Sequence, residues 1–316
     1  MATLTVLNVG LALLLDQSGP ALRDPEYHAI ANALRAKRVE TPAAKLTLVL
    51  GSSRVALGLD AGRLSTPSTT VFNFGMPGAG PYMMNIYWDR LTAEGIRPDS
   101  AVIELMHPFY NAAHRQLDVG FLDSSRLSFS EAKGLIDDGY PAAGPLRRLG
   151  IARVFPGTRH GLDLAEHLGL EALTARRDKE RVEYKADDFG YRPRFYPPEG
   201  REKLRTLAHG QYNPFYPTFK PNPVPINRLR DLIRKMQAGG VNVTLLLTPE
   251  GSEFRSLMSP EMATAINEFV AGMVAEFAVK VIDARDWLPD EAFYDQHHLL
   301  PDGGQAFAER LKPLLP

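Results

Sequence analysis

The sequence contains no cysteine. Its absence excludes disulfide scaffolds, thiolate zinc sites, iron–sulfur clusters and cysteine nucleophiles. It does not identify the compartment, since secreted proteins without disulfides are common. The chain also lacks an excess of either charge, because 36 Lys and Arg balance 37 Asp and Glu to a formal net charge of -1. No bulk attraction to nucleic acid is therefore expected, and we predict no nucleic-acid partner.

The apolar run at the N-terminus, Leu4 to Leu15, is short for a membrane span. As a helix it extends about 20 Å, against the roughly 30 Å of a bilayer core. A secretory signal is not indicated, because the first positive charge is Arg23. Two interpretations stay open: a buried helix, or the remnant of a membrane anchor within an N-terminal segment, 1–40. We favour the anchor, and with it membrane association and a cell-envelope or membrane-associated location over a cytoplasmic one.

Short apolar runs alternate with helical patterns along the rest of the chain. Continuous hydrophobicity is typical of strands that are covered on both faces of a parallel sheet. Such runs lie at 46–50, 69–75, 100–106, 241–249 and 278–284, and helical patterns at 25–39, 82–95, 226–240 and 260–277. The alternation predicts an α/β domain over 41–316, whose ligands bind at the carboxyl ends of the strands.

One long segment interrupts this alternation. From about 111 to 225 there are aromatic residues, helical patches and many prolines, but no strong signal for a buried strand. More than a hundred residues cannot form a structureless loop inside a compact domain. We therefore predict a large helical and irregular insertion that caps the active face.

Two motifs near opposite ends of the chain fit one chemistry. Gly51-Ser52-Ser53-Arg54 follows a predicted strand, where a sharp turn into a helix can expose a serine hydroxyl. Asp295-Gln296-His297-His298 precedes a C-terminal helix. A serine is a weak nucleophile and needs a base, which an Asp-oriented histidine supplies. Each motif alone is common; together, both at strand ends, they favour a Ser-His-Asp triad.

These motifs resemble those of the SGNH (GDSL-like) hydrolase superfamily. VLGSSRVALGLD at 49–60 is similar to its first block, and FYDQHHLLPDGGQAFAERL at 293–311 to its last. The resemblance implies a flavodoxin-like three-layer parallel sheet, Ser53 as nucleophile, His298 as base and Asp295 as its orienter. FNFGMPGAG at 72–80 looks like the second block, which implies that the Gly75 amide contributes to the oxyanion hole.

The third block of that family, Gly-x-Asn-Asp, is missing. The corresponding strand runs into His107-Pro108-Phe109-Tyr110-Asn111, so His107 or Asn111 would have to replace the asparagine donor. Loss of one oxyanion donor costs about 3 kcal/mol of transition-state stabilisation. The Gly-Ser-Ser-Arg turn resembles that of a divergent branch of the superfamily found in the cell envelope. This branch contains O-acetylation proteins and a D-alanine transfer protein.

Several residues have a second interpretation. Ser52 is the rival nucleophile, although a serine before the nucleophile more often bonds the local backbone. His297 is the rival base, and with Asp295 and His298 it could bind a metal, but no further histidine cluster supports that. Glu104 fits a hydrogen-bonded structural carboxylate. Arg54 fits either a substrate carboxylate or a core acid.

The sequence therefore predicts a serine esterase or O-acyltransferase that acts on acyl esters, including acetyl groups on carbohydrate. It predicts no cofactor and no metal. The alternative is a catalytically impaired protein of the same fold that binds a glycan or a partner protein. A nucleotide-binding module is disfavoured, because GMPGAG lacks the Lys-Ser/Thr of a phosphate loop.

Overall fold

The computed structural model describes residues 2–17, 20–112, 123–141, 143–155, 185–216 and 218–315. The chain forms two compact units. One unit comprises residues 1–32 and 121–185, and the other comprises 33–120 and 186–316. The predicted insertion at 111–225 is thus divided between the two units, and its central part, 156–184, lies outside the described residues.

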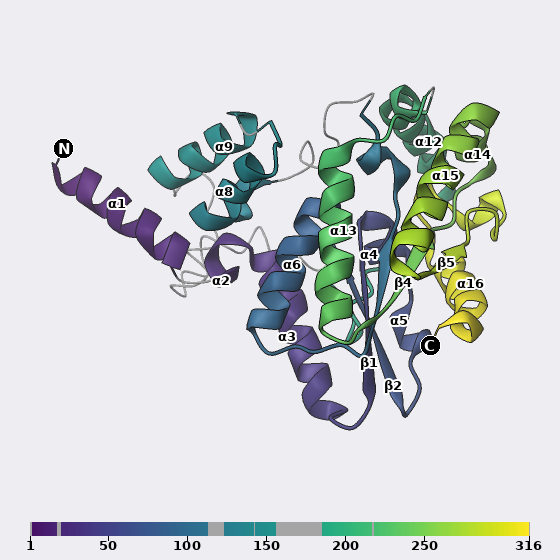
Figure 1. Cartoon of the computed structure of the whole chain (residues 1–316), viewed down its shortest axis with the longest axis horizontal. Coiled ribbons are helices and arrows are strands. Elements are labelled where there is room, and N and C mark those ends of the chain that lie inside the picture. Colours follow the sequence, from purple (N-terminus) through teal and green to yellow (C-terminus); the bar gives the residue numbers. More distant parts are fainter. Residues whose placement is uncertain are drawn as a thin grey trace. The chain divides into compact units, whose positions relative to one another are not determined.

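The larger unit is built on one parallel sheet (Figure 1). Its strands are β1 (Lys45–Gly51), β2 (Thr69–Gly75), β3 (Ser100–Glu104), β4 (Asn242–Leu247) and β5 (Lys280–Asp283). Their order is β2-β1-β3-β4-β5, and every pairing is parallel. This is the flavodoxin-like order, whose switch point lies between the first and third strands. The prediction of an α/β fold with a parallel sheet is confirmed; four strands are buried over nearly their whole length, whereas in the edge strand β5 only Ile282 is buried.

Alternate residues of the strands face two layers of helices. The face that carries Val49, Val102 and Leu246 packs on α4 (Ser53–Gly58), α5 (Ala61–Leu64) and α16 (Pro301–Leu311). On the other face, α6 (Pro81–Ala93) and α13 (Pro223–Ala238) lie side by side in Figure 1. The Phe74 ring contacts Tyr87 of α6 with ring centroids 6.0 Å apart. These two layers cover the sheet, as the continuous apolar runs predicted.

Three more helices belong to the larger unit: α12 (Pro198–Tyr212), α14 (Ser252–Ser256) and α15 (Pro260–Phe277). Helix α3 (Pro25–Glu40) begins in the smaller unit and ends in the larger one. The helices predicted at 25–39, 82–95, 226–240 and 260–277 are confirmed as α3, α6, α13 and α15.

The smaller unit consists of short helices in its described part. They are α1 (Ala2–Gln17), α2 (Pro20–Arg23), the 3₁₀ turn η2 (Ser124–Arg126), α8 (Phe129–Asp137) and α9 (Ala143–Val154). α9 packs against α1, and its buried Arg153 donates to the carbonyls of Ser125 at 3.3 Å and Leu127 at 2.6 Å. No helix within the described ranges is long and apolar enough to cross a membrane.

The strand register brings the motif-bearing loops to one edge of the sheet. Gly51 at the end of β1 is paired with Gly75 at the end of β2. Glu104 at the end of β3 is paired with Leu246, one residue before β4 ends. Because all strands run the same way, the loops that follow them converge at this carboxyl edge.

Candidate active site

Ser53 is the first residue of α4, directly after β1. Helix α4 begins there because the Ser52 hydroxyl caps it by accepting the Arg54 amide at 3.2 Å. The Ser52 side chain is buried and engaged in this cap. Ser53, one residue later, is only partly buried, so of the two serines Ser53 has the accessible hydroxyl.

The loop before α16 carries the acid–base pair. Asp295 Oδ1 accepts the amides of His297 at 3.0 Å and His298 at 2.6 Å, which closes a tight turn. Gln296 in that turn has φ 66°, a left-handed conformation that is unfavourable for a residue other than glycine and that is often stored at functional sites. The turn leaves Asp295 Oδ2 directed at the His298 ring.

A continuous hydrogen-bond chain joins the three residues. Ser53 Oγ lies 2.8 Å from His298 Nε2, and His298 Nδ1 lies 2.8 Å from Asp295 Oδ2. With a proton on Nδ1 held by the carboxylate, Nε2 is free to accept the serine proton. The structure thus brings together the three residues that the sequence predicted as a triad, from positions 245 apart in the chain for Ser53 and His298.

The amide of Gly75 is already occupied, which corrects its assignment to the oxyanion hole. Its N–H donates to Asn73 Oδ1 at 2.9 Å in a buried position. Asn73 Nδ2 in turn donates to two carbonyls, that of Val55 in α4 at 2.7 Å and that of Leu59, directly after α4, at 2.8 Å. Gly75 and Asn73 therefore hold the nucleophile helix on the sheet. Asn73 lies in the segment FNFGMPGAG, but the presence of an asparagine there did not indicate that it would bond α4 and the Gly75 amide.

Gly75 is glycine because α4 approaches it closely. An added Cβ would lie 2.5 Å from the Ala56 amide nitrogen and 2.9 Å from the Val55 Cβ. Both neighbours belong to the helix that Ser53 begins, so a methyl group there would push the helix outward.

We therefore expect Gly75→Ala to lower the free energy of unfolding by about 1–3 kcal/mol through overpacking. Urea denaturation followed by circular dichroism measures this change. Gly95→Ala is an unsuitable control because Gly95 has φ 85°, whereas Gly272→Ala, with nothing within 4 Å of the added Cβ, is suitable. Unchanged stability in Gly75→Ala would contradict the close packing of α4.

Two backbone amides, in the turns directly after β1 and β2, have no partner in the described part of the chain. Among the described residues, no hydrogen bond is formed by the amides of Ser53 and Gly78. Gly78 has φ 75° and lies in the loop directly after β2, inside a turn closed by the Ala79 amide on the Met76 carbonyl at 2.9 Å. These two N–H groups are candidates for the donors of an oxyanion hole.

The two substitutes predicted for the missing asparagine differ. The Asn111 amide is used within the protein, because Nδ2 donates to the Thr218 carbonyl at 2.6 Å and Oδ1 accepts the Lys220 amide at 3.0 Å. Asn111 is therefore a structural link and not an oxyanion donor. His107 lies in the 3₁₀ turn η1 (His107–Tyr110), with its ring edge-on to Tyr216 at 4.9 Å.

His107 is buried, and its Nε2 has no hydrogen-bond partner among the described atoms. Burial and the neighbouring Arg54 and Arg285 lower the pKa of His107 to about 3. The ring is therefore neutral at physiological pH and retains one N–H to donate. Of the two predicted substitutes, only His107 keeps an unused polar atom.

His297, the rival base, does not face the serine. Its buried ring lies against Tyr212 at 4.3 Å and Phe254 at 5.1 Å, and it is edge-on to His298 at 4.4 Å. Burial and neighbouring positive charge, first that of His298, lower its pKa well below the usual value. Within the described residues, no group of three or more His, Asp or Glu side chains is placed to hold a metal ion.

Arg54 points into the protein and not to the surface. It bonds Glu250 and the carbonyls of Thr248 and Pro249, and only 4% of its side chain is exposed. Of the two interpretations of Arg54, contact with a core acid is the one that the structure shows. Glu104 is a hydrogen-bonded carboxylate, since Oε2 accepts the Ser52 amide at 2.6 Å.

Aromatic side chains that the sequence did not single out flank His298. The Tyr294 ring is stacked on the His298 ring at 5.4 Å with an interplanar angle of 8°, and Tyr196 packs on Tyr294 at 4.3 Å. Tyr294 therefore covers one face of the His298 ring. Its position next to Asp295 is the only sequence signal for this contact.

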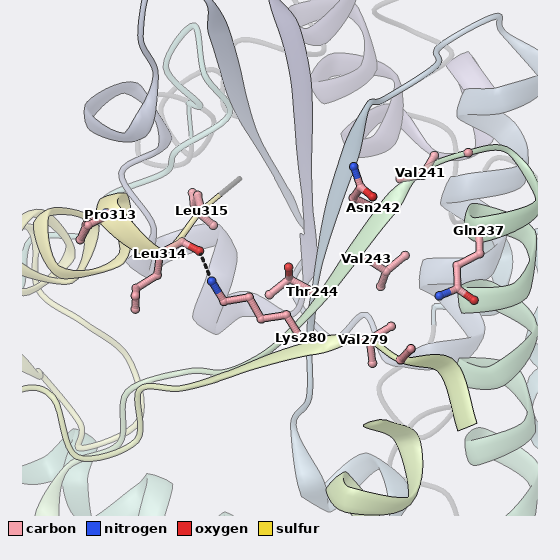
Figure 2. Close-up of a pocket in the computed structure, with 12 residues that line it drawn as sticks. Gln237, Val241, Asn242, Val243, Thr244, Val279, Lys280, Pro313, Leu314 and Leu315 are labelled. Carbon is pink, nitrogen blue, oxygen red and sulfur yellow. Dashed lines mark hydrogen bonds between the residues drawn. The ribbon is translucent and has the colours of Figure 1, made fainter. Parts of the chain in front are cut away.

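A pocket of about 570 Å³ lies at the opposite, amino edge of the sheet. It is lined by the first residues of β4 and β5 and by the C-terminal segment, and Figure 2 shows Lys280 Nζ donating to the Leu314 carbonyl at 2.8 Å. None of its lining residues belongs to the Ser53 site. This pocket is therefore separate from the site that contains Ser53 and His298.

Comparison with known proteins adds little. No protein-family model and no curated protein sequence matches the chain. Among solved structures, a "putative acylhydrolase" of Bacteroides fragilis matches with a TM-score of 0.40 and 9% identity over 90% of this chain and 95% of that one. A "putative arylesterase" of Agrobacterium tumefaciens matches with a TM-score of 0.30 and 10% identity over 85% and 97%. At such low similarity, neither likeness carries an argument about activity.

Proposed function

We propose that this protein is a serine esterase or O-acyltransferase whose triad is Ser53, His298 and Asp295. The observation that carries the proposal is the unbroken chain from Ser53 Oγ through both ring nitrogens of His298 to Asp295 Oδ2, with both contacts at 2.8 Å. An accessible serine at a strand-to-helix turn, a base in contact with it and a carboxylate that orients the base form the arrangement that acyl transfer requires.

In the first half of the reaction, His298 Nε2 takes the proton of Ser53 as Oγ forms a bond to the ester carbonyl carbon. The carbonyl oxygen becomes an oxyanion, for which the amides of Ser53 and Gly78 are the proposed donors. The tetrahedral intermediate then breaks the ester C–O bond, and the leaving alkoxide takes the proton from His298. Asp295 keeps Nδ1 protonated and offsets the charge of the imidazolium.

In the second half, an acceptor hydroxyl attacks the acyl group on Ser53. His298 removes the acceptor proton and returns it to Ser53 Oγ as the acyl–serine bond breaks. Water as acceptor gives an esterase, and a sugar hydroxyl gives an O-acyltransferase. The same residues serve both outcomes, so the acceptor is decided by what binds beside Ser53.

The experiment is hydrolysis of p-nitrophenyl acetate by the wild type and by two adjacent serine variants. Ser53→Ala removes the nucleophile, and we expect kcat/KM to fall to the uncatalysed background. Ser52→Ala removes only a helix cap, which costs about 1 kcal/mol of stability, and we expect it to keep most of the activity. Activity that survives in Ser53→Ala but is lost in Ser52→Ala would overturn the assignment of the nucleophile.

A second candidate function is a binding protein with an impaired site. The observation in its favour is that Asn111 bonds main-chain atoms of residues 218 and 220, so it supplies no third oxyanion donor. This candidate predicts that folded wild-type protein shows no hydrolysis above that of Ser53→Ala.

A further inference from the structure

We propose that Arg54 is a positioning residue that fixes the distance between Ser53 and His298 by joining the nucleophile helix to the loop after β4, and through it to the histidine loop. The inference rests on the proposed function, because it assigns a role within that site. Arg54 is adjacent to Ser53 in sequence, yet its side chain is buried on the side away from solvent.

The guanidinium group of Arg54 binds one short segment at several points. Nη1 donates to Glu250 Oε1 at 3.1 Å, and Nη2 donates to the carbonyls of Thr248 at 3.2 Å and Pro249 at 2.6 Å. Residues 248–250 have no regular secondary structure, so no strand or helix ladder fixes them. The planar fork of an arginine supplies the donors that hold such a segment in one conformation.

Glu104 extends this network to the turn at Ser52. Its Oε2 accepts the Ser52 amide at 2.6 Å, and its Oε1 accepts the Thr248 hydroxyl at 3.1 Å and lies 4.0 Å from Arg54 Nε. The turn before Ser53 and the segment after β4 therefore share two connections, one through Glu104 and one through Arg54. Burial opposes the charge of Arg54, but Glu250 and Glu104 outweigh it and raise the pKa of the guanidinium.

The same segment continues directly into contact with the histidine loop. The Gly251 amide donates to the Gln296 carbonyl at 3.0 Å, and Gln296 is the left-handed residue between Asp295 and His298. The approach is close, because an added Cβ on Gly251 would lie 1.8 Å from Gln296 Oε1. A continuous path thus runs from Ser53 through Arg54, Glu250 and Gly251 to the turn that carries His298.

A purely stabilising role does not explain this arrangement. A buried ion pair costs desolvation energy and is often no more stable than apolar side chains of the same volume. A second buried arginine, Arg153, also donates to two main-chain carbonyls but lies in the other unit. Replacement of Arg153 therefore serves as a matched control: it also removes a buried arginine fork, but in the unit that does not contain Ser53.

The test exploits the absence of cysteine from the chain. In Ser53→Cys the only thiol lies where Ser53 Oγ contacts His298, and a nearby imidazolium lowers the pKa of a thiol. The rate of alkylation by iodoacetamide as a function of pH measures that pKa without any ester substrate. A lowered pKa that returns to the ordinary value of about 8.5 in Ser53→Cys/His298→Ala reports the Ser–His contact.

We expect Ser53→Cys/Arg54→Lys to behave like the His298→Ala variant, with alkylation at pH 7 about tenfold slower than in Ser53→Cys. Lysine keeps the positive charge but loses the fork, so a change in thiol pKa reports position and not charge. Ser53→Cys/Arg153→Lys should alkylate at the rate of Ser53→Cys. Melting curves establish whether each variant is folded. If the Arg54 variant does not fold, Ser53→Cys/Glu250→Gln replaces it in the test, because Glu250 is the partner of Arg54 in the same connection.

A folded Arg54→Lys or Glu250→Gln variant with the thiol pKa of Ser53→Cys would overturn the positioning role. An ordinary thiol pKa in Ser53→Cys itself would also overturn it, since there would be no Ser–His contact to maintain. The proposed function fails differently: a lowered thiol pKa together with wild-type protein that does not hydrolyse p-nitrophenyl acetate would reject the esterase and leave the result on Arg54 standing.

Discussion

We expect Asp295→Asn to lower kcat/KM for ester hydrolysis by about 10³–10⁴-fold while the protein stays folded. The asparagine oxygen can still accept the amides of His297 and His298, which Oδ1 accepts in the wild type. The other position becomes an NH2 group facing His298 Nδ1. That group donates where the carboxylate accepted, so the proton moves to Nε2 and the ring can no longer take the proton of Ser53.

A matched control comes from the same segment of the chain. Asp290 also accepts a backbone amide, that of Ser252 at 2.6 Å, on the exposed surface. Asp290→Asn is expected to keep wild-type kcat/KM. If Asp295→Asn retained full activity with an unchanged pH profile, His298 would not depend on Asp295 for its tautomer, and the proposed triad would be reduced to a pair.

We expect acidification below pH 6.5 to destabilise the protein, because two buried histidines remain neutral in the folded state. The pKa of His107 is about 3 and that of His297 lies well below 6.5. Between these values and 6.5 the unfolded chain binds more protons than the folded one, so the free energy of unfolding falls as pH falls. Each histidine contributes about 1.4 kcal/mol per pH unit in that window.

His297→Phe removes one of these two contributions. Phenylalanine fits the contacts of the His297 ring with Tyr212 and Phe254 and removes two buried ring nitrogens that have no partner in the described structure. Between pH 7 and pH 5 the variant should lose less stability than the wild type, with a difference of at most about 1.4 kcal/mol for each pH unit below 6.5. Urea denaturation at the two pH values measures the difference. An equal loss in both proteins would mean that His297 titrates in the folded state.

The sheet could be predicted from the sequence because each of its strands is a continuous apolar run. The run 46–50 became β1, between β2 and β3, and the run 278–284 became β5 at the edge. The contacts of Ser53, His298 and Asp295 could be predicted because Gly51-Ser52-Ser53 directly follows a predicted strand and the Asp-His loop directly precedes a predicted helix. The ends of such strands and helices depend on the residue types nearby in the chain, and these can be read from a single sequence.

The roles of Gly75, Asn111 and Arg54 could not be derived in this way. The Gly75 amide is occupied by a side chain two residues away, and Asn111 bonds a segment 107 to 109 residues distant. Arg54 reaches Glu250 across 196 residues. Such contacts depend on tertiary packing, and residue type gives only the capacity to form them. The division of 111–225 between two units likewise had no compositional signal.

The central claim is that Ser53 is activated by His298, and reaction with a fluorophosphonate followed by peptide mass spectrometry tests it most directly. The phosphonyl group mimics an acyl carbonyl and bonds only an activated nucleophile. The account predicts an adduct on Ser53 in the wild type that is absent in Ser53→Ala and in His298→Ala. A folded wild type without an adduct, or an adduct on Ser52 or in the folded His298→Ala variant, would contradict it.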